Sequence, residues 1–177
     1  MNCQYCQIAE GKEKAIVLYE DKELFVAVRD RVITPGQITV FSREHYPILE
    51  MVPDEVLQRA AVLANKVSIA VFESLGSRGT NIMIQNGLGA GQTVPHFGIE
   101  IVPRQEGDNL NLQWQPRQLA EEDMETAYLM LKDEISKLLH IGKKKEKPAP
   151  EAAKAPESVK EQKGKENYLL KSIRRIP

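Results

Sequence analysis

One stretch of helical periodicity separates two groups of short alternating segments, and this order limits the folds available to the chain. Apolar residues recur at three- and four-residue steps after Pro53, and Gly76 is a typical helix stop, so residues 53–76 are predicted to form a long helix. A second helical pattern covers about residues 119–139. Segments with the alternation of strands lie at residues 15–21, 23–31, 36–44, 80–87 and 96–104. We therefore expect one domain over residues 1–140, built from five strands and two helices.

The composition changes near the end of this domain. Residues 141–177 carry 11 Lys and Arg against 5 Asp and Glu, whereas the whole chain carries 24 against 25. Residues 141–165 are rich in Lys, Pro, Ala and Glu and poor in large apolar side chains, so they are predicted to be a flexible linker. The last segment, residues 166–177, is apolar and basic again. Two interpretations stay open: a solvated tail, and a tail that binds a protein or RNA partner.

Hydropathy and the N-terminus restrict the compartment. No apolar run approaches the roughly 20 residues that span a membrane, and the N-terminus lacks a signal-peptide pattern. We therefore expect a cytoplasmic protein with no membrane association. The two cysteines, Cys3 and Cys6, are separated by two residues. In a reducing compartment such a pair is typical of a metal or redox site rather than of a structural disulfide.

The three histidines give the cysteine pair candidate partners. His140 ends the last predicted helix, where an imidazole complements the helix dipole. His45 follows the third predicted strand and His96 opens the fifth, and each alone is more often structural than a ligand. Together with Cys3 and Cys6 they form a complete tetrahedral ligand set for zinc. The long spacing between the pairs leaves both interpretations open, and a thioredoxin-like role is weaker because no strand precedes the cysteines.

Several segments, in the same order, resemble the histidine triad (HIT) family. The segment NGLGAGQTVPHFGIEIVPR, residues 86–104, is similar to the family signature, in which a glycine-rich loop precedes three alternating histidines and Pro-Arg. The CxxC segment at the N-terminus and TPGQITVFSREHYP around His45 resemble the family as well. The resemblance covers about residues 1–140. It implies an α+β HIT-like fold, a strongly bent antiparallel sheet with one long helix and a second C-terminal helix, paired as a homodimer.

The resemblance also implies a closed, structural zinc site. Family members hold zinc with the CxxC pair, the histidine after the third strand and the first triad histidine. These positions are Cys3, Cys6, His45 and His96 in this chain. Residues that match the family's contacts to phosphate and leaving group are Asn86, Gly91, Gln92 and Thr93.

The departures from the family pattern concern catalysis. The middle triad histidine, which attacks the phosphate in active members, is Gly98 here, and glycine has no side chain to act as a nucleophile. The third triad position is Glu100, a carboxylate that repels an anionic phosphate. Arg29 stands where active members place a ribose acceptor, and it offers only donors, which suits direct contact with a phosphate.

Three hypotheses follow for the function. The first is a zinc-stabilised pseudoenzyme that binds a purine nucleotide or another phosphate ligand without turnover. The second is an interaction module whose residues 166–177 engage a protein or RNA. The third is an atypical phosphohydrolase in which Glu100 activates a water.

Overall fold

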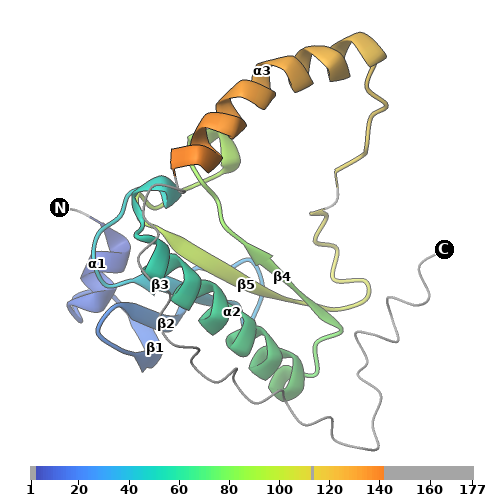
Figure 1. The fold of residues 1–177 in the computed structure, drawn as a ribbon. Coiled ribbons are helices and arrows are strands. Elements are labelled where there is room, and N and C mark those ends of the chain that lie inside the picture. Colours follow the sequence, from blue (N-terminus) through green and yellow to red (C-terminus); the bar gives the residue numbers. More distant parts are fainter. Residues whose placement is uncertain (1–2, 113, 142–177) are drawn as a thin grey trace, which may run out of the picture. The chain divides into compact units, whose positions relative to one another are not determined.

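The computed structural model describes residues 3–112 and 114–141, and its centre is one antiparallel sheet. The five strands are β1 (Ala15–Glu20), β2 (Leu24–Arg29), β3 (Ile38–Ser42), β4 (Gly79–Met83) and β5 (Gly98–Arg104). They pair in the order β1-β2-β3-β5-β4, and every pairing is antiparallel (Figure 1). The predicted α+β class and the number of strands are confirmed.

Helices lie on both faces of the sheet. The long helix α2 (Asp54–Leu75) packs its apolar side chains on one face, against residues that include Val26, Val40 and Ile101. The short helix α1 (Gln4–Ala9) packs Tyr5 and Ile8 on the other face. The sheet is therefore the middle layer, and the face under α1 carries the residues of the candidate site.

The ends of α2 follow from its sequence. Pro53 is the N-cap, Asp54 and Glu55 stand in the first turn where the helix dipole favours negative charge, and Gly76 ends the helix with a left-handed φ of 61°. The predicted helix over residues 53–76 is confirmed. Two further short turns, η1 (Leu49–Met51) and η2 (Leu88–Ala90), were not predicted.

The register of β5 decides which side chains face α1. Gly98 pairs with Phe41 and Glu100 pairs with Thr39, so these four residues share one face with Ala27, the partner of Thr39 on β2. Both degenerate triad positions therefore lie in the middle of the sheet, below the short helix that carries the cysteine pair. This placement puts the degenerate triad positions next to the predicted metal ligands.

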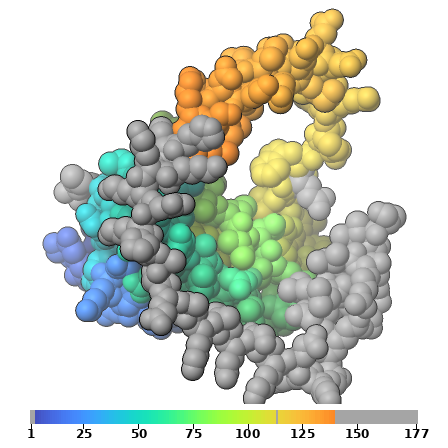
Figure 2. Space-filling view, viewed as in Figure 1, coloured from blue at the N-terminus to red at the C-terminus, as the bar shows by residue number. Residues whose placement is uncertain are grey.

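The chain divides into two compact units, and the second begins at Leu110. Within it, α3 (Glu121–Ile141), orange in Figure 2, confirms the predicted C-terminal helix. Along α3, Met124, Tyr128, Leu131, Ile135 and Leu138 recur at helical spacing and are exposed.

Membrane spans were searched for in the described helices. Not one of them combines the length and the apolar character that a membrane span requires. The predicted linker beyond Ile141 and the motif of residues 166–177 lie outside the described residues. Homodimerisation stays a prediction.

Candidate metal centre and adjoining cavity

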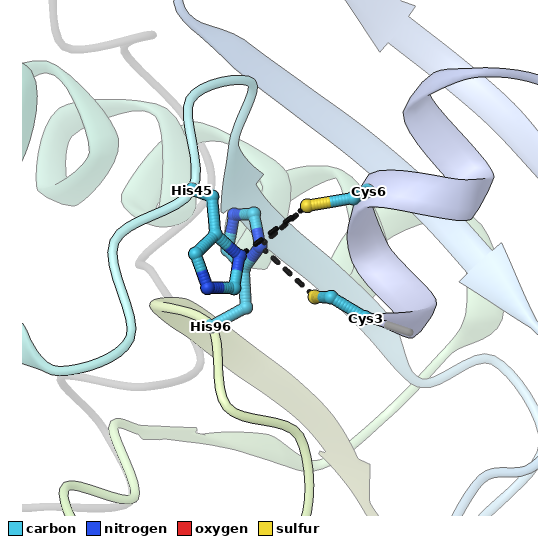
Figure 3. Close-up of side chains that lie close together, drawn as sticks. All are labelled: Cys3, Cys6, His45 and His96. Carbon is cyan, nitrogen blue, oxygen red and sulfur yellow. Dashed lines mark hydrogen bonds between the residues drawn. The ribbon is translucent and has the colours of Figure 1, made fainter. Parts of the chain in front are cut away.

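The structure brings together the four predicted metal ligands from three distant parts of the chain. Cys3 is the N-cap of α1 and Cys6 lies within this helix, while His45 follows β3 and His96 precedes β5 (Figure 3). Cys3 Sγ lies 3.3 Å from His96 Nδ1, and Cys6 Sγ lies 3.3 Å from His45 Nδ1 and 3.6 Å from His96 Nδ1. The four ligand atoms all lie within 4.8 Å of one another, and both cysteines are free thiols.

These separations fit one tetrahedral ion. Zn–S bonds of about 2.3 Å and Zn–N bonds of about 2.0 Å place neighbouring ligand atoms roughly 3.3 to 3.8 Å apart around the metal. The observed sulfur–nitrogen distances of 3.3 to 3.6 Å lie in this range. Two thiolates and two imidazoles are also a donor set that zinc prefers. The cluster is therefore close to the geometry of a metal site, and all four coordination positions would be protein ligands.

A second contact orients His96 for metal binding. Its Nε2 lies 2.8 Å from the carbonyl oxygen of Ser42, and a carbonyl only accepts, so Nε2 carries the proton. The lone pair of Nδ1 then points at the two sulfurs. Burial lowers the pKa of His96 to about 4, which keeps the imidazole neutral at physiological pH. The ring is thus held in the form that a metal requires.

The cysteine pair favours a metal over a free thiolate. Burial, with the neighbouring Cys3 acting in the same direction, raises the pKa of the Cys6 thiol to about 11. Without a metal the thiol keeps its proton at neutral pH and is a poor nucleophile. A bound cation displaces this proton, so metal binding and deprotonation of the pair are one event. This chemistry argues against a thioredoxin-like role for the pair.

A cavity of about 550 Å³ adjoins the cluster on the same face of the sheet. Four of the predicted ligand-binding residues line it: Arg29, Gly91, Gln92 and Thr93. Asn86 does not. Its side chain accepts from the Leu49 N–H and donates to the Glu50 carboxylate, so it fastens the loop to the η1 turn.

The side chain of Gln92 is also engaged within the protein. Its Oε1 accepts from the Gly87 N–H at 2.7 Å, and its Nε2 donates to the carbonyls of Pro47 and Val94 at 2.8 and 2.9 Å. Gln92 thus shapes the rim of the cavity by holding the glycine-rich loop in place. The backbone N–H groups of Gly91 and Gln92 donate within the same loop, to Leu88 and Gly87.

Tyr5 fills the space beside Gly98. A Cβ atom built on Gly98 would lie 3.0 Å from Tyr5 Cε2 and 3.6 Å from its hydroxyl oxygen. The Tyr5 ring is 4% exposed and stacks on Phe41 with ring centroids 4.8 Å apart. The position where a histidine nucleophile would project is therefore occupied by an aromatic ring from α1.

Glu100 accepts four hydrogen bonds on its two carboxylate oxygens. Its Oε1 accepts from the Tyr5 hydroxyl at 3.0 Å and from Arg29 Nη2 at 2.8 Å. Its Oε2 accepts from Gln37 Nε2 at 2.6 Å and from Thr39 Oγ1 at 2.9 Å. Arg29 Nε donates to Thr39 Oγ1 at 3.0 Å, which closes the network. Burial and the adjacent Glu100 charge raise the pKa of Tyr5 well above its usual value, so the phenol stays a donor.

The sequence interpretation did not include Tyr5, Arg31, Gln37 or Thr39 among the site residues, although all but Thr39 line the cavity. For Gln37 and Thr39 a signal was present, because they share the alternation of Phe41 and so face the same side of β3. Tyr5 carried no such signal, since its role depends on where α1 packs.

The comparisons with known proteins agree on one family. The HIT domain family model matches residues 10–107. An Arabidopsis thaliana protein named adenylylsulfatase HINT3 is 30% identical over 138 residues, which cover 78% of this chain and 66% of that protein. An uncharacterized HIT-like protein of Methanocaldococcus jannaschii is 34% identical over 106 residues, 60% of this chain and 81% of the relative. Among solved structures, a zinc-bound histidine triad family protein from Mycobacterium smegmatis is 33% identical, with a TM-score of 0.59 over 66% of this chain and 85% of its own.

Proposed function

The chain belongs to the HIT family, and from this premise we propose that it is a zinc-stabilised member that binds a nucleoside or nucleotide without turning it over. The observation that carries the proposal is the packing of Tyr5 against Gly98 beside a cavity that stays open. The covalent step of the family is lost at that position, while space for a ligand persists. The expected role is that of a binding protein rather than a hydrolase.

The phenol, the imidazole and the carboxylate that line the cavity are all engaged within the protein. Among the described residues that line it, Tyr5 keeps its proton and donates to Glu100, and His96 belongs to the metal cluster. Both oxygens of Glu100 already accept two hydrogen bonds each, which is the full capacity of a carboxylate. A carboxylate in this state is poorly placed to accept a proton from a water, and this disfavours the atypical phosphohydrolase.

The remaining cavity suits a flat organic ligand. About 550 Å³ is within the range of small-molecule sites. Val32, Ile33 and Met83 provide apolar walls, and Arg31 and Gln85 provide polar groups near the opening. Such a mixture fits a nucleobase, whose faces are apolar and whose edges carry donors and acceptors.

The zinc would have a structural role. All four ligands come from the protein, so the site would have no open position at which a water or substrate could bind the metal. The ion would instead connect α1 to the segments before β5 and after β3. Since α1 also carries Tyr5, the metal would hold that ring in its place in the cavity.

We expect the zinc-loaded protein to bind at least one of adenosine, guanosine, AMP and GMP, and the Met83→Trp variant to bind it at least about tenfold more weakly. The larger ring would fill part of the cavity that Met83 lines. Ile82→Trp is the matched control, because neighbouring residues of a strand point to opposite faces and Ile82 does not line the cavity. Calorimetric titration measures all three proteins.

The same preparation tests the absence of turnover. Incubation at high protein concentration with adenylyl sulfate, the substrate implied by the name of the Arabidopsis relative, should release no AMP above a protein-free control. Release that persists through purification and is lost in Met83→Trp would overturn the proposal. So would the failure of all four ligands to bind a folded, metal-loaded protein.

A further inference from the structure

The deep end of the cavity contains a complete anion-binding arrangement, and the anion in it belongs to the protein. Donors from α1, β2, β3 and the residue before β3 converge on Glu100: Tyr5, Arg29, Thr39 and Gln37. A phenol, a guanidinium, a hydroxyl and an amide N–H are together the donor set that would bind a phosphate or sulfate oxygen. In this chain the anion that these donors bind is the buried carboxylate of Glu100.

The charges at this end of the cavity cancel. The Arg29 side chain is 12% exposed and the Glu100 side chain is 11% exposed, and they form an ion pair with 2.8 Å between Nη2 and Oε1. Thr39 Oγ1 also accepts a hydrogen bond from Arg29 Nε, and the guanidinium carbon lies 5.3 Å from the centroid of the Tyr5 ring. Arg31, the other cation of the lining, is exposed to solvent, where its field is screened. Among the described residues, the deep end of the cavity therefore has no unpaired positive charge that would attract an anion.

Two loop N–H groups and the space beside Gly98, which could otherwise receive an anion, are already occupied. The Gly91 and Gln92 N–H groups donate within their own loop, so these two are not directed at a ligand. The Tyr5 ring occupies the space next to Gly98. A phosphate at the deep end would have to approach a carboxylate whose donors are already engaged, and like charges repel strongly where water is scarce.

We propose that Glu100 is a specificity-determining residue, which makes the cavity select an uncharged ligand such as a nucleoside over the same molecule with a phosphate monoester. This inference rests on the proposed function, that the cavity binds a ligand of the nucleotide class. It goes further because it names one side chain, Glu100, that makes the cavity prefer an uncharged ligand. Arg29, Gln37, Thr39 and Tyr5 act as positioning residues, since they hold the carboxylate in place.

The test compares adenosine with AMP, and guanosine with GMP, by calorimetric titration of the full-length, zinc-loaded protein. The native protein should bind the nucleoside at least about tenfold more tightly than its monophosphate, because only the charged ligand would lose its hydration without meeting an unbalanced positive charge. Glu100→Gln keeps the size of the side chain and frees the charge of Arg29, so it should bring the two affinities to within about threefold. Glu106→Gln is the matched control: it removes one exposed carboxylate that does not line the cavity, and should leave the ratio unchanged.

The outcomes separate the two proposals. Tighter binding of the monophosphate by the native protein would overturn the role of Glu100 while leaving the binding function intact, and this comparison needs no variant. An unchanged ratio in a Glu100→Gln protein that melts cooperatively would overturn it as well. If neither the nucleosides nor the monophosphates bind, the proposed function fails first, and the inference fails with it.

Discussion

The Cys3→Ser variant is expected to melt at least about 10 °C below the native protein and to lose its metal. Structural zinc sites contribute about 10–16 kcal/mol of apparent binding free energy in small zinc-finger peptides. A hydroxyl is a much poorer zinc ligand than a thiolate, so the loss of several kcal/mol is expected even with three ligands left. In a protein of this size, each 1 kcal/mol lowers Tm by about 2–4 °C. The Cys3 side chain is also 2% exposed, which leaves no room for solvent to replace it.

Metal analysis and thermal melting, each with and without a chelator, measure this effect. Lys14→Ser is the control, because it places the same residue at an exposed position directly before β1. A chelator should lower the Tm of the native protein and of the control, and should change the Tm of Cys3→Ser little. If the native protein carries no metal and a chelator does not change its Tm, the proposal of a metal centre is wrong.

The Gly98→His variant should be less stable than the native protein by about 3 kcal/mol and should remain inactive. Overpacking a filled core commonly costs about 1–3 kcal/mol, and here even a Cβ atom would lie 3.0 Å from the Tyr5 ring. The imidazole cannot reach a reactive position while that ring fills the space. We therefore expect that a histidine at this position does not by itself confer the chemistry of an active triad.

A double-mutant cycle with Tyr5→Ala identifies the cause. Tyr5→Ala alone removes a buried ring and should cost about 3–5 kcal/mol. Because the new histidine fills part of the space that the ring leaves, the double variant should lose at least about 1 kcal/mol less than the sum of the two single losses. Urea unfolding measures all three variants, with Gly98→Ala as the smaller substitution at the same site. Additive losses, or turnover of adenylyl sulfate by Gly98→His alone, would contradict the steric explanation.

Local patterns were enough to predict the scaffold of this protein. The spacing of apolar residues, the capping proline and the terminal glycine of α2 are short-range signals, and the helix begins and ends where they indicate. Helix α1 was missed because six residues are too few for periodicity, and so short a helix is marginal without its packing. It exists here because Tyr5 and Ile8 are buried against the sheet.

The candidate site needed more than local patterns. Cys3 and His96 are 93 residues apart. Their residue types suggested a zinc site, but the family resemblance was needed to favour one in which their side chains meet. Asn86 and Gln92 matched ligand contacts by resemblance, yet their hydrogen bonds hold the loop. The missing information in both cases was tertiary: which strand lies beside which, and what the packing of α1 places above Gly98.

The packing of Tyr5 beside Gly98 also limits which substitutions this sequence can accept. A histidine at position 98 would place its Cβ atom 3.0 Å from Tyr5 Cε2, so the Tyr5 ring would have to shift before an imidazole fits. Removal of Tyr5 first takes a donor from Glu100 and opens a void beside Phe41. Each single step thus passes through a less stable protein, although the scaffold and the metal ligands stay the same. Gly98 and Tyr5 thus constrain each other, so a substitution at either position is expected to lower the stability of the protein.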